Sequence, residues 1–163
     1  MAEDLEIRAE PEPERTERVR FCSRCGALHD PGRNEPPGRS RVCVTCGMGV
    51  YLECTRDALG SLGTFFLVVT EELAIGAVSE GAEGIFGEEG GLVGSPLAAL
   101  LTSPLGEDRL ARTVRAAALG VRERVAVPIE ASSESARGFG PLEARVSPCG
   151  PPRAALVAIE PAL

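Results

Sequence analysis

Two short cysteine motifs, each followed by a glycine, lie in the first third of this 163-residue chain. They read Cys-Ser-Arg-Cys-Gly over 22–26 and Cys-Val-Thr-Cys-Gly over 43–47, with seventeen residues between the two cysteine pairs. A gap of two residues lets both sulfurs of a pair reach one ion from a tight turn, and the glycine permits the positive φ that such a turn needs. The spacing therefore predicts one metal site whose ligands are Cys22, Cys25, Cys43 and Cys46.

Four thiolate ligands complete a tetrahedron and leave no open position, so we expect a structural metal ion rather than a catalytic one. The segment around the cysteines is too small to fold by apolar burial alone. Metal binding is then expected to supply most of its folding free energy, on the order of 10–16 kcal/mol in comparable zinc peptides. Six arginines lie in residues 18–52, and we expect their positive potential to help keep the thiols ionised.

This arrangement resembles the zinc ribbon family, with both CxxCG turns intact over about thirty residues. It also resembles the iron site of rubredoxins, which uses the same pair of turns. Aromatic residues that could shelter a redox iron are few, with only Phe21 and Tyr51 nearby. We therefore expect zinc to be the bound metal. Rubredoxin-type iron is one alternative, and a metal-free dithiol switch is another.

Three other residues with metal or redox chemistry lie outside this pattern. His29, the only histidine, falls between the cysteine pairs, and we expect it to be a solvated loop residue. We expect Cys54 and Cys149 to be buried or half-buried thiols. The sequence alone does not establish whether the fold brings these two cysteines together.

Charge is unevenly distributed along the chain, whose net charge is -7. Residues 1–17 carry -5, residues 18–52 carry +4, and residues 53–163 carry -6. So acidic a chain is a poor candidate for general nucleic-acid binding, which leaves only the basic cysteine segment for such a role. We expect no secretory signal in the acidic first seventeen residues and no membrane helix, and therefore a cytoplasmic protein with reduced cysteines.

Changes in composition divide the chain into four parts. Residues 1–17 are acidic and contain prolines, which predicts a disordered acidic tail. The zinc ribbon is predicted over 18–52 and a short, helix-compatible connector over 53–63. From residue 64 to the end, the sequence predicts a second domain.

Hydrophobic patterns in the second domain predict an α+β fold in which helices are segregated from an antiparallel sheet. Apolar runs over 65–69 and 73–78 predict a hairpin, and Pro96 introduces a short helix over 97–101. A helix is predicted over 107–119, because Leu110, Val114 and Ala117 share one face and Gly120 follows the last turn. Three strands are then predicted over 121–130, 140–148 and 153–160.

The order of these elements, together with the phrase FFLVVTEELAIGAVSEGAEGIFGEEGGLVGSPLAALL over 65–101, resembles a PAS domain, the sensor module of many signalling proteins. The resemblance covers residues 64–161. It implies a five-stranded antiparallel sheet around a small cavity, self-association into a dimer, and sensing through a ligand or a protein partner.

No cofactor comes with the PAS resemblance. The predicted helix over 107–119 contains no histidine for haem, and residues 92–101 contain no cysteine for flavin photochemistry. The cavity is therefore expected to hold side chains or a small apolar ligand. A serine–histidine–aspartate set and a phosphate-binding GxxxxGK motif are also missing from the sequence.

Taken together, the sequence predicts a non-enzymatic signalling or regulatory protein, in which a structural zinc ribbon is joined to a PAS sensor and protein-interaction domain. Two other functions stay open at this stage. One is a nucleic-acid-associated regulator that uses the basic ribbon, and the other is electron transfer through rubredoxin-like iron.

Overall fold

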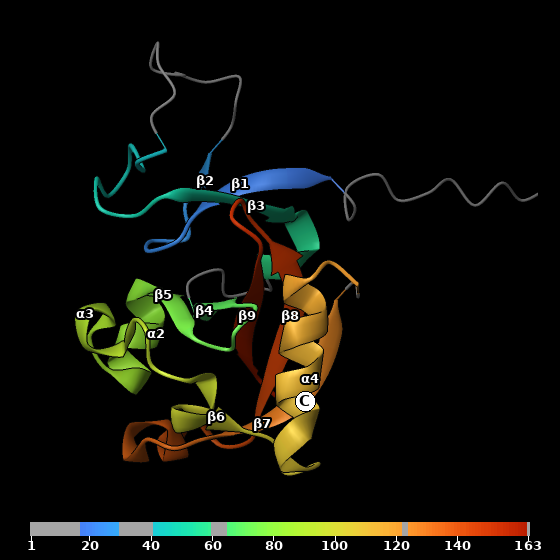
Figure 1. The fold of residues 1–163 in the computed structure, drawn as a ribbon. Coiled ribbons are helices and arrows are strands. Elements are labelled where there is room, and N and C mark those ends of the chain that lie inside the picture. Colours follow the sequence, from blue (N-terminus) through green and yellow to red (C-terminus); the bar gives the residue numbers. More distant parts are fainter. Residues whose placement is uncertain (1–16, 30–40, 60–64, 122–123, 163) are drawn as a thin grey trace, which may run out of the picture.

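The computed structural model describes residues 17–29, 41–59, 65–121 and 124–162. The acidic tail predicted over 1–17 therefore lies outside the described residues except for Glu17, and so does most of the loop between the cysteine pairs. Within the described ranges the chain is α+β, as predicted, with two antiparallel sheets and a few helices (Figure 1).

The small sheet contains three strands in the order β2-β1-β3. These are β1 (Arg18–Cys22), β2 (Leu28–His29) and β3 (Tyr51–Thr55). Strand β3 continues past residue 52, where the ribbon was predicted to end, and the 3-10 helix η1 (Arg56–Leu59) follows it directly. The start of the predicted connector is thus a strand that pairs with β1 along the full length of both.

The large sheet contains six strands in the order β5-β4-β9-β8-β7-β6, and every pair is antiparallel. The strands are β4 (Phe66–Thr70), β5 (Ile75–Val78), β6 (Leu101–Thr102), β7 (Val125–Ala131), β8 (Leu142–Cys149) and β9 (Ala154–Pro161). The predicted hairpin and the last three predicted strands are all present. The sixth strand, β6, adds two residues to the edge of the five strands expected, because residues 101–102 pair with β7 instead of continuing a helix.

Short helices connect the hairpin to the long helix α4 (Glu107–Ala118). They are α2 (Glu80–Phe86), α3 (Glu89–Leu92) and η2 (Leu97–Ala99), and η3 (Glu134–Phe139) follows β7. Ser79 begins α2, because its hydroxyl accepts a hydrogen bond from Ala82 N and also one from Phe66 N on β4. This one side chain therefore caps the helix and ties it to the sheet.

One face of the large sheet packs against α4. Leu110, Val114, Ala117 and Ala118 recur at helical spacing, and all four are buried against that face. Alternate strand residues such as Ala144, Val146 and Val157 meet them. The helix-facing core is therefore built from the aliphatic residues that the sequence offers in place of aromatic ones.

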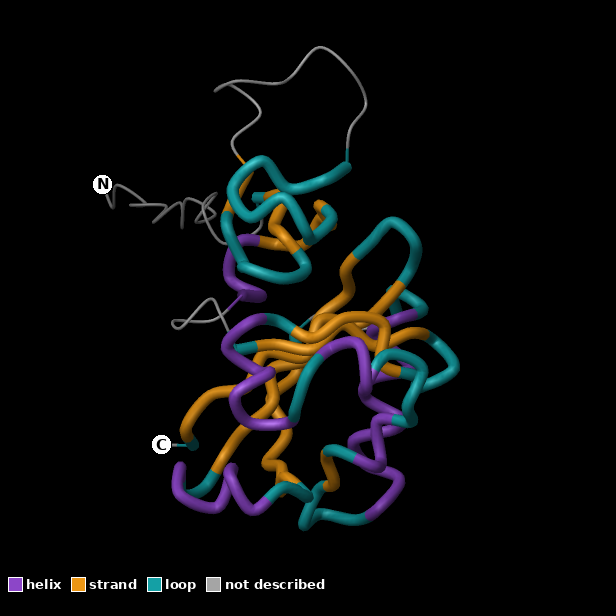
Figure 2. The backbone as a smooth tube through the Cα atoms, turned by 90° about the vertical axis from the view of Figure 1, so that its left-hand side faces the viewer, coloured by secondary structure: helices purple, strands orange, loops and turns teal. Residues whose placement is uncertain are grey.

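Part of the opposite face of the large sheet, over β4 and β9, is covered by the small sheet and η1, which are called the ribbon from here on. Phe66 and Val68 on β4, with Leu156 and Ala158 on β9, form a second buried cluster together with residues of the small sheet and η1. From the ribbon side the cluster contains Phe21, Leu52, Cys54, Ala58 and Leu59. Figure 2 shows the small sheet lying above the larger one. Strand β9 is buried on both faces, which explains its nearly continuous apolar sequence.

The structure contains a hollow of about 510 Å³ at the edge of the large sheet, lined by residues that include Pro104, Pro128, Glu130 and Pro141. The small cavity implied by the PAS resemblance was expected inside the fold, whereas this hollow lies beside β7 and β8. In the part of the chain that the structure describes, no helix is long and apolar enough to cross a membrane.

Replacing Phe21 tests the shared core directly. Its ring packs edge-on against Phe66 at a centroid distance of 5.5 Å, and both side chains are fully buried. We expect Phe21→Ala to lower the free energy of unfolding by about 3–5 kcal/mol in urea titration. Leu28→Ala, at a half-exposed position of the same sheet, serves as the control and should change it by less than about 0.5 kcal/mol. A loss below about 1 kcal/mol for Phe21→Ala would show that the ribbon and the sheet do not share a core.

Candidate metal centre

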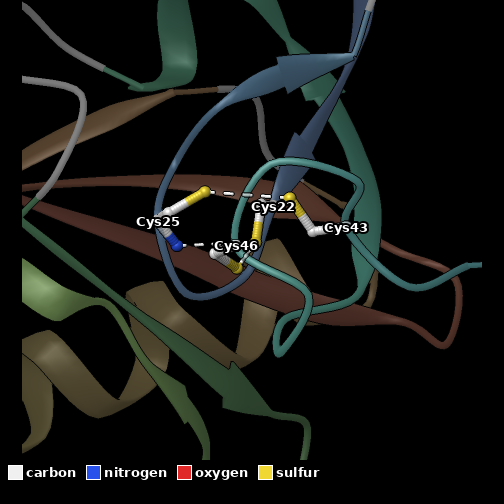
Figure 3. Close-up of side chains that lie close together, drawn as sticks. All are labelled: Cys22, Cys25, Cys43 and Cys46. Carbon is white, nitrogen blue, oxygen red and sulfur yellow. Dashed lines mark hydrogen bonds between the residues drawn. The ribbon is translucent and has the colours of Figure 1, made fainter. Parts of the chain in front are cut away.

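All four predicted ligands meet at one point of the small sheet. Cys22 is the last residue of β1 and Cys25 lies on the turn that follows it, while the second pair lies on the turn that precedes β3, between the paired residues Val42 and Val50. Their sulfurs all lie within 4.8 Å of one another, with Cys22 Sγ 3.7 Å from Cys46 Sγ and Cys25 Sγ 3.8 Å from Cys43 Sγ (Figure 3). The four cysteines can therefore hold one metal ion.

The spacing of the sulfurs fits a tetrahedral thiolate site. Four sulfurs placed about 2.3 Å from a central zinc lie about 3.8 Å from one another along the edges of a regular tetrahedron. The two distances given above match that edge length. The donor set thus fits a four-coordinate ion that prefers sulfur, and it leaves no position for substrate or water.

Both cysteine turns have the same backbone hydrogen bond and the same glycine conformation. Gly26 N donates to Cys22 O at 3.1 Å, and Gly47 N donates to Cys43 O at 2.9 Å. The two glycines have φ values of 73° and 71°, which only glycine adopts without strain. The role predicted for the glycine after each pair is therefore confirmed by the backbone.

Backbone N–H groups point at the sulfurs. Arg24 N and Cys25 N donate to Cys22 Sγ at 3.3 and 3.4 Å, and in the second turn Thr45 N donates to Cys43 Sγ at 3.3 Å. Gly49 N completes the set by donating to Cys46 Sγ at 3.4 Å. These donors stabilise negative charge on the sulfurs whether or not a positively charged side chain is near.

Gly49 is a site residue that the sequence reasoning missed. A Cβ at this position would collide with Cys22 Sγ and lie 2.9 Å from Arg24 Cβ, so the second turn can approach the first only without a side chain there. The available signal was the glycine two residues after Gly47, in the sequence Cys-Gly-Met-Gly.

The thiols of the two turns differ in acidity. For Cys43, burial raises the pKa, but hydrogen bonds from the Cys46 and Thr45 backbone outweigh it and lower the pKa to about 6. Backbone hydrogen bonds from Gly49 and Met48 also lower the pKa of Cys46. Burial raises the pKa of Cys22, and it raises that of Cys25 to about 12. The second turn therefore carries the more acidic thiols.

Two of the arginines near the site face a carboxylate. Arg18 and Arg20 lie beside Glu53 at 3.9 and 3.6 Å, so a nearby carboxylate offsets their charge. The pKa values of Cys43 and Cys46 are lowered by backbone donors foremost. Arg33 and Arg39 lie outside the described residues.

Arg24 instead joins the first turn to helix α2. Its guanidinium lies 3.0 Å from Glu83 and 3.9 Å from Glu80, and its carbonyl accepts a hydrogen bond from Glu80 N at 2.7 Å. The N–H of the same residue donates to Cys22 Sγ. A single residue thus contacts a metal ligand on one side and a helix of the large domain on the other.

His29 is not one of the converging ligands. It lies in β2 rather than in a loop, and its ring packs on Tyr51 with a centroid distance of 4.6 Å. Tyr51 in turn accepts a hydrogen bond from Val44 N through its hydroxyl at 2.9 Å. Pairing of β2 with β1 explains the difference, because it draws His29 out of the polar loop sequence that follows.

Cys54 and Cys149 are buried away from the four ligands, as expected of thiols outside the pattern. Both belong to the core between the ribbon and the large sheet. Burial raises the pKa of each thiol to about 12.

Substitution of Gly49 tests the close approach of the two turns. We expect Gly49→Ala to reduce zinc affinity at least tenfold, because the new methyl group displaces Cys22 Sγ. Competition with a coloured chelator measures the affinity. Gly90→Ala is the matched control, since a Cβ there meets no atom within 4 Å. Unchanged affinity in Gly49→Ala would contradict the geometry of the site.

Metal binding should release protons, chiefly from Cys22 and Cys25. Their pKa values are raised in the metal-free protein, whereas a bound metal requires thiolates. Zinc affinity should therefore increase with pH through the neutral range and fall as the pH is lowered. Calorimetric titration with zinc in buffers of different ionisation enthalpy counts the protons, and a count of zero at pH 7 would contradict the assignment.

Comparisons of this chain with protein families, with curated proteins and with solved structures found no match. The structure itself shows a four-cysteine group that could hold a metal ion, consistent with a zinc ribbon, packed on an α+β domain.

Proposed function

We propose that this chain is a non-enzymatic signalling or regulatory protein, in which a structural zinc ribbon is joined to a PAS-like sensor and protein-interaction domain. The observation that carries the proposal is the closed cluster of four sulfurs in a unit that covers one face of a larger sheet. A closed cluster organises structure instead of activating a substrate. Binding, rather than catalysis, is the activity that such a centre supports.

Zinc is the proposed metal, because four thiolates at tetrahedral spacing suit this ion and a cytoplasmic protein keeps its thiols reduced. Rubredoxin-type iron uses the same donors and is the alternative. The two ions differ in colour, since iron in a thiolate site absorbs visible light and zinc does not.

A PAS-like domain is proposed from the succession of elements in the second part of the chain. A hairpin of β4 and β5 is followed by short helices, by α4, and by three consecutive antiparallel strands, β7 to β9. This is the order that the PAS resemblance implies. In such a domain a signal passes through self-association, a protein partner or a small apolar ligand.

Exposed apolar side chains on the second turn support a protein partner. Val44 and Met48 are 62% and 71% exposed, beside the buried ligand Cys43. Large apolar side chains held at the tip of a rigid turn are typical of a docking surface rather than of a nucleic-acid interface.

A nucleic-acid-associated regulator remains the second candidate, because residues 18–52 carry +4. The structure gives it less support than the sequence does. Arg18 and Arg20 pair with Glu53, and Arg24 pairs with Glu83, so acidic groups partly neutralise the described basic surface.

Metal analysis and native mass spectrometry of protein purified without added metal test this proposal. We expect one equivalent of zinc, no visible absorption, and a mass that corresponds either to a multiple of the 17.0 kDa chain or to a chain with a retained small molecule. One equivalent of iron with visible absorption would replace the zinc assignment with electron transfer. A ligand-free monomer at every concentration would contradict the proposed sensor and interaction role of the second domain.

Salt-dependent binding to random DNA or RNA would favour the second candidate, a nucleic-acid-associated regulator.

A further inference from the structure

The two cysteines outside the metal centre come from different units of the fold. Cys54 lies on β3 of the ribbon, and Cys149 is the last residue of β8 in the large sheet. Both side chains are thiols in this structure. The proposed function gives neither of them a role.

A backbone contact sets the register between these two strands. Glu53 N donates to Gly150 O at 2.6 Å, and Gly150 N donates to Glu53 O at 3.1 Å. Residues that exchange both hydrogen bonds form a hydrogen-bonded antiparallel pair. One step along the strands, Cys54 therefore lies opposite Cys149 at a position without hydrogen bonds.

Such a position suits a disulfide. Directly opposite Cα atoms lie about 4.5 Å apart at non-hydrogen-bonded positions of a regular antiparallel pair. Disulfides join Cα atoms that are about 4.4–6.8 Å apart. Regular antiparallel geometry, continued by one residue from the Glu53–Gly150 pair, would thus place the two Cα atoms within the range that a disulfide spans.

Both thiols also point to the same side. Side chains alternate along a strand, so Glu53 faces Arg20 at the surface while Cys54 faces the core. Cys54 and Cys149 belong to the same buried cluster and are 0% and 7% exposed. After burial itself, the charge of Cys54 is the next cause that raises the pKa of Cys149, as expected of neighbouring thiols.

We propose that Cys54 and Cys149 form a redox-active dithiol, which a small-molecule disulfide such as oxidised glutathione converts to a cross-strand disulfide joining the ribbon to the large sheet. The pair is separate from the metal centre, whose four sulfurs lie in the two CxxC turns.

The reaction proceeds by two thiol–disulfide exchanges. Cys149, the more exposed thiol, loses its proton and attacks one sulfur of oxidised glutathione, which releases one glutathione thiolate. Cys54 then loses its proton and attacks the Cys149 sulfur of the mixed disulfide, which releases the second glutathione. The two thiols lose two electrons, and one oxidised glutathione is reduced to two glutathione molecules.

This disulfide would keep the ribbon on the sheet without help from the metal. In the reduced protein, the contact between the ribbon and the large sheet depends on apolar packing and on the shape of the ribbon. Metal binding supports that shape. In the oxidised protein a covalent bond closes the long segment between Cys54 and Cys149, so the unfolded chain loses much of its freedom. Oxidation should therefore make the packing of the ribbon resistant to a chelator.

The test uses the full zinc-loaded chain. Because buried thiols of high pKa react slowly, one sample is incubated folded with oxidised glutathione, and another is unfolded in urea and refolded with zinc in a glutathione redox buffer. After free thiols are alkylated, trypsin cleaves beside Arg41, Arg56, Arg145 and Arg153. We expect a linked pair of fragments 42–56 and 146–153, with fragment ions that assign the bond to Cys54 instead of Cys43 or Cys46.

Two variants and a stability measurement complete the design. Cys54→Ala and Cys149→Ala should each abolish the linked pair and still bind one zinc. The urea midpoint of the wild-type protein should rise on oxidation, whereas that of either variant should not. If the refolded wild-type protein contains no bond between residues 54 and 149, or only mixed disulfides with glutathione, the proposal is wrong.

Discussion

Convergence of four sulfurs on one point is the constraint on which the rest of this structure depends. The two cysteine turns come from segments with little apolar content of their own, and the ribbon is too small to be held by packing within itself. A metal ion held by the four cysteines would fix both turns, and with them the positions of β1 and β3. The four-cysteine cluster therefore lies where a bound ion would set the shape of the surface that the small sheet presents to the rest of the chain.

The alternation of side chains along β1 and β3 connects the four-cysteine cluster to the core shared with the large domain. On β1, Cys22 faces the metal centre while its neighbour Phe21 faces the shared core, and both are fully buried. On β3, Tyr51 and Leu52 divide in the same way. Because adjacent residues of one strand point to opposite faces, a disturbance of the sulfurs should propagate to the apolar contacts with β4 and β9. Arg24 offers a second route, through its hydrogen bond and ion pairs to α2.

Local patterns were sufficient to predict much of this fold. The CxxCG spacing identified all four converging cysteines, and the period of Leu110, Val114 and Ala117 identified α4, because both features are written in short stretches of chain. What the sequence could not show arises from contacts between distant segments. The residues after 52 resemble a helix in composition, yet pairing with β1 makes them part of β3. Similarly, Arg24 has an acidic partner on α2 that no local pattern indicates. The requirement for glycine at position 49 depends on how closely the two turns approach, which is a property of the assembled site.

Hydrogen exchange of the full chain, measured with zinc and after zinc removal, tests most directly whether metal binding stabilises the packing of β1 and β3 on the large sheet. The account predicts that removal accelerates exchange in β1 and β3 and also in the adjoining strand β4, while α4 on the other face changes least. Equal protection of β1, β3 and β4 in both states would contradict it.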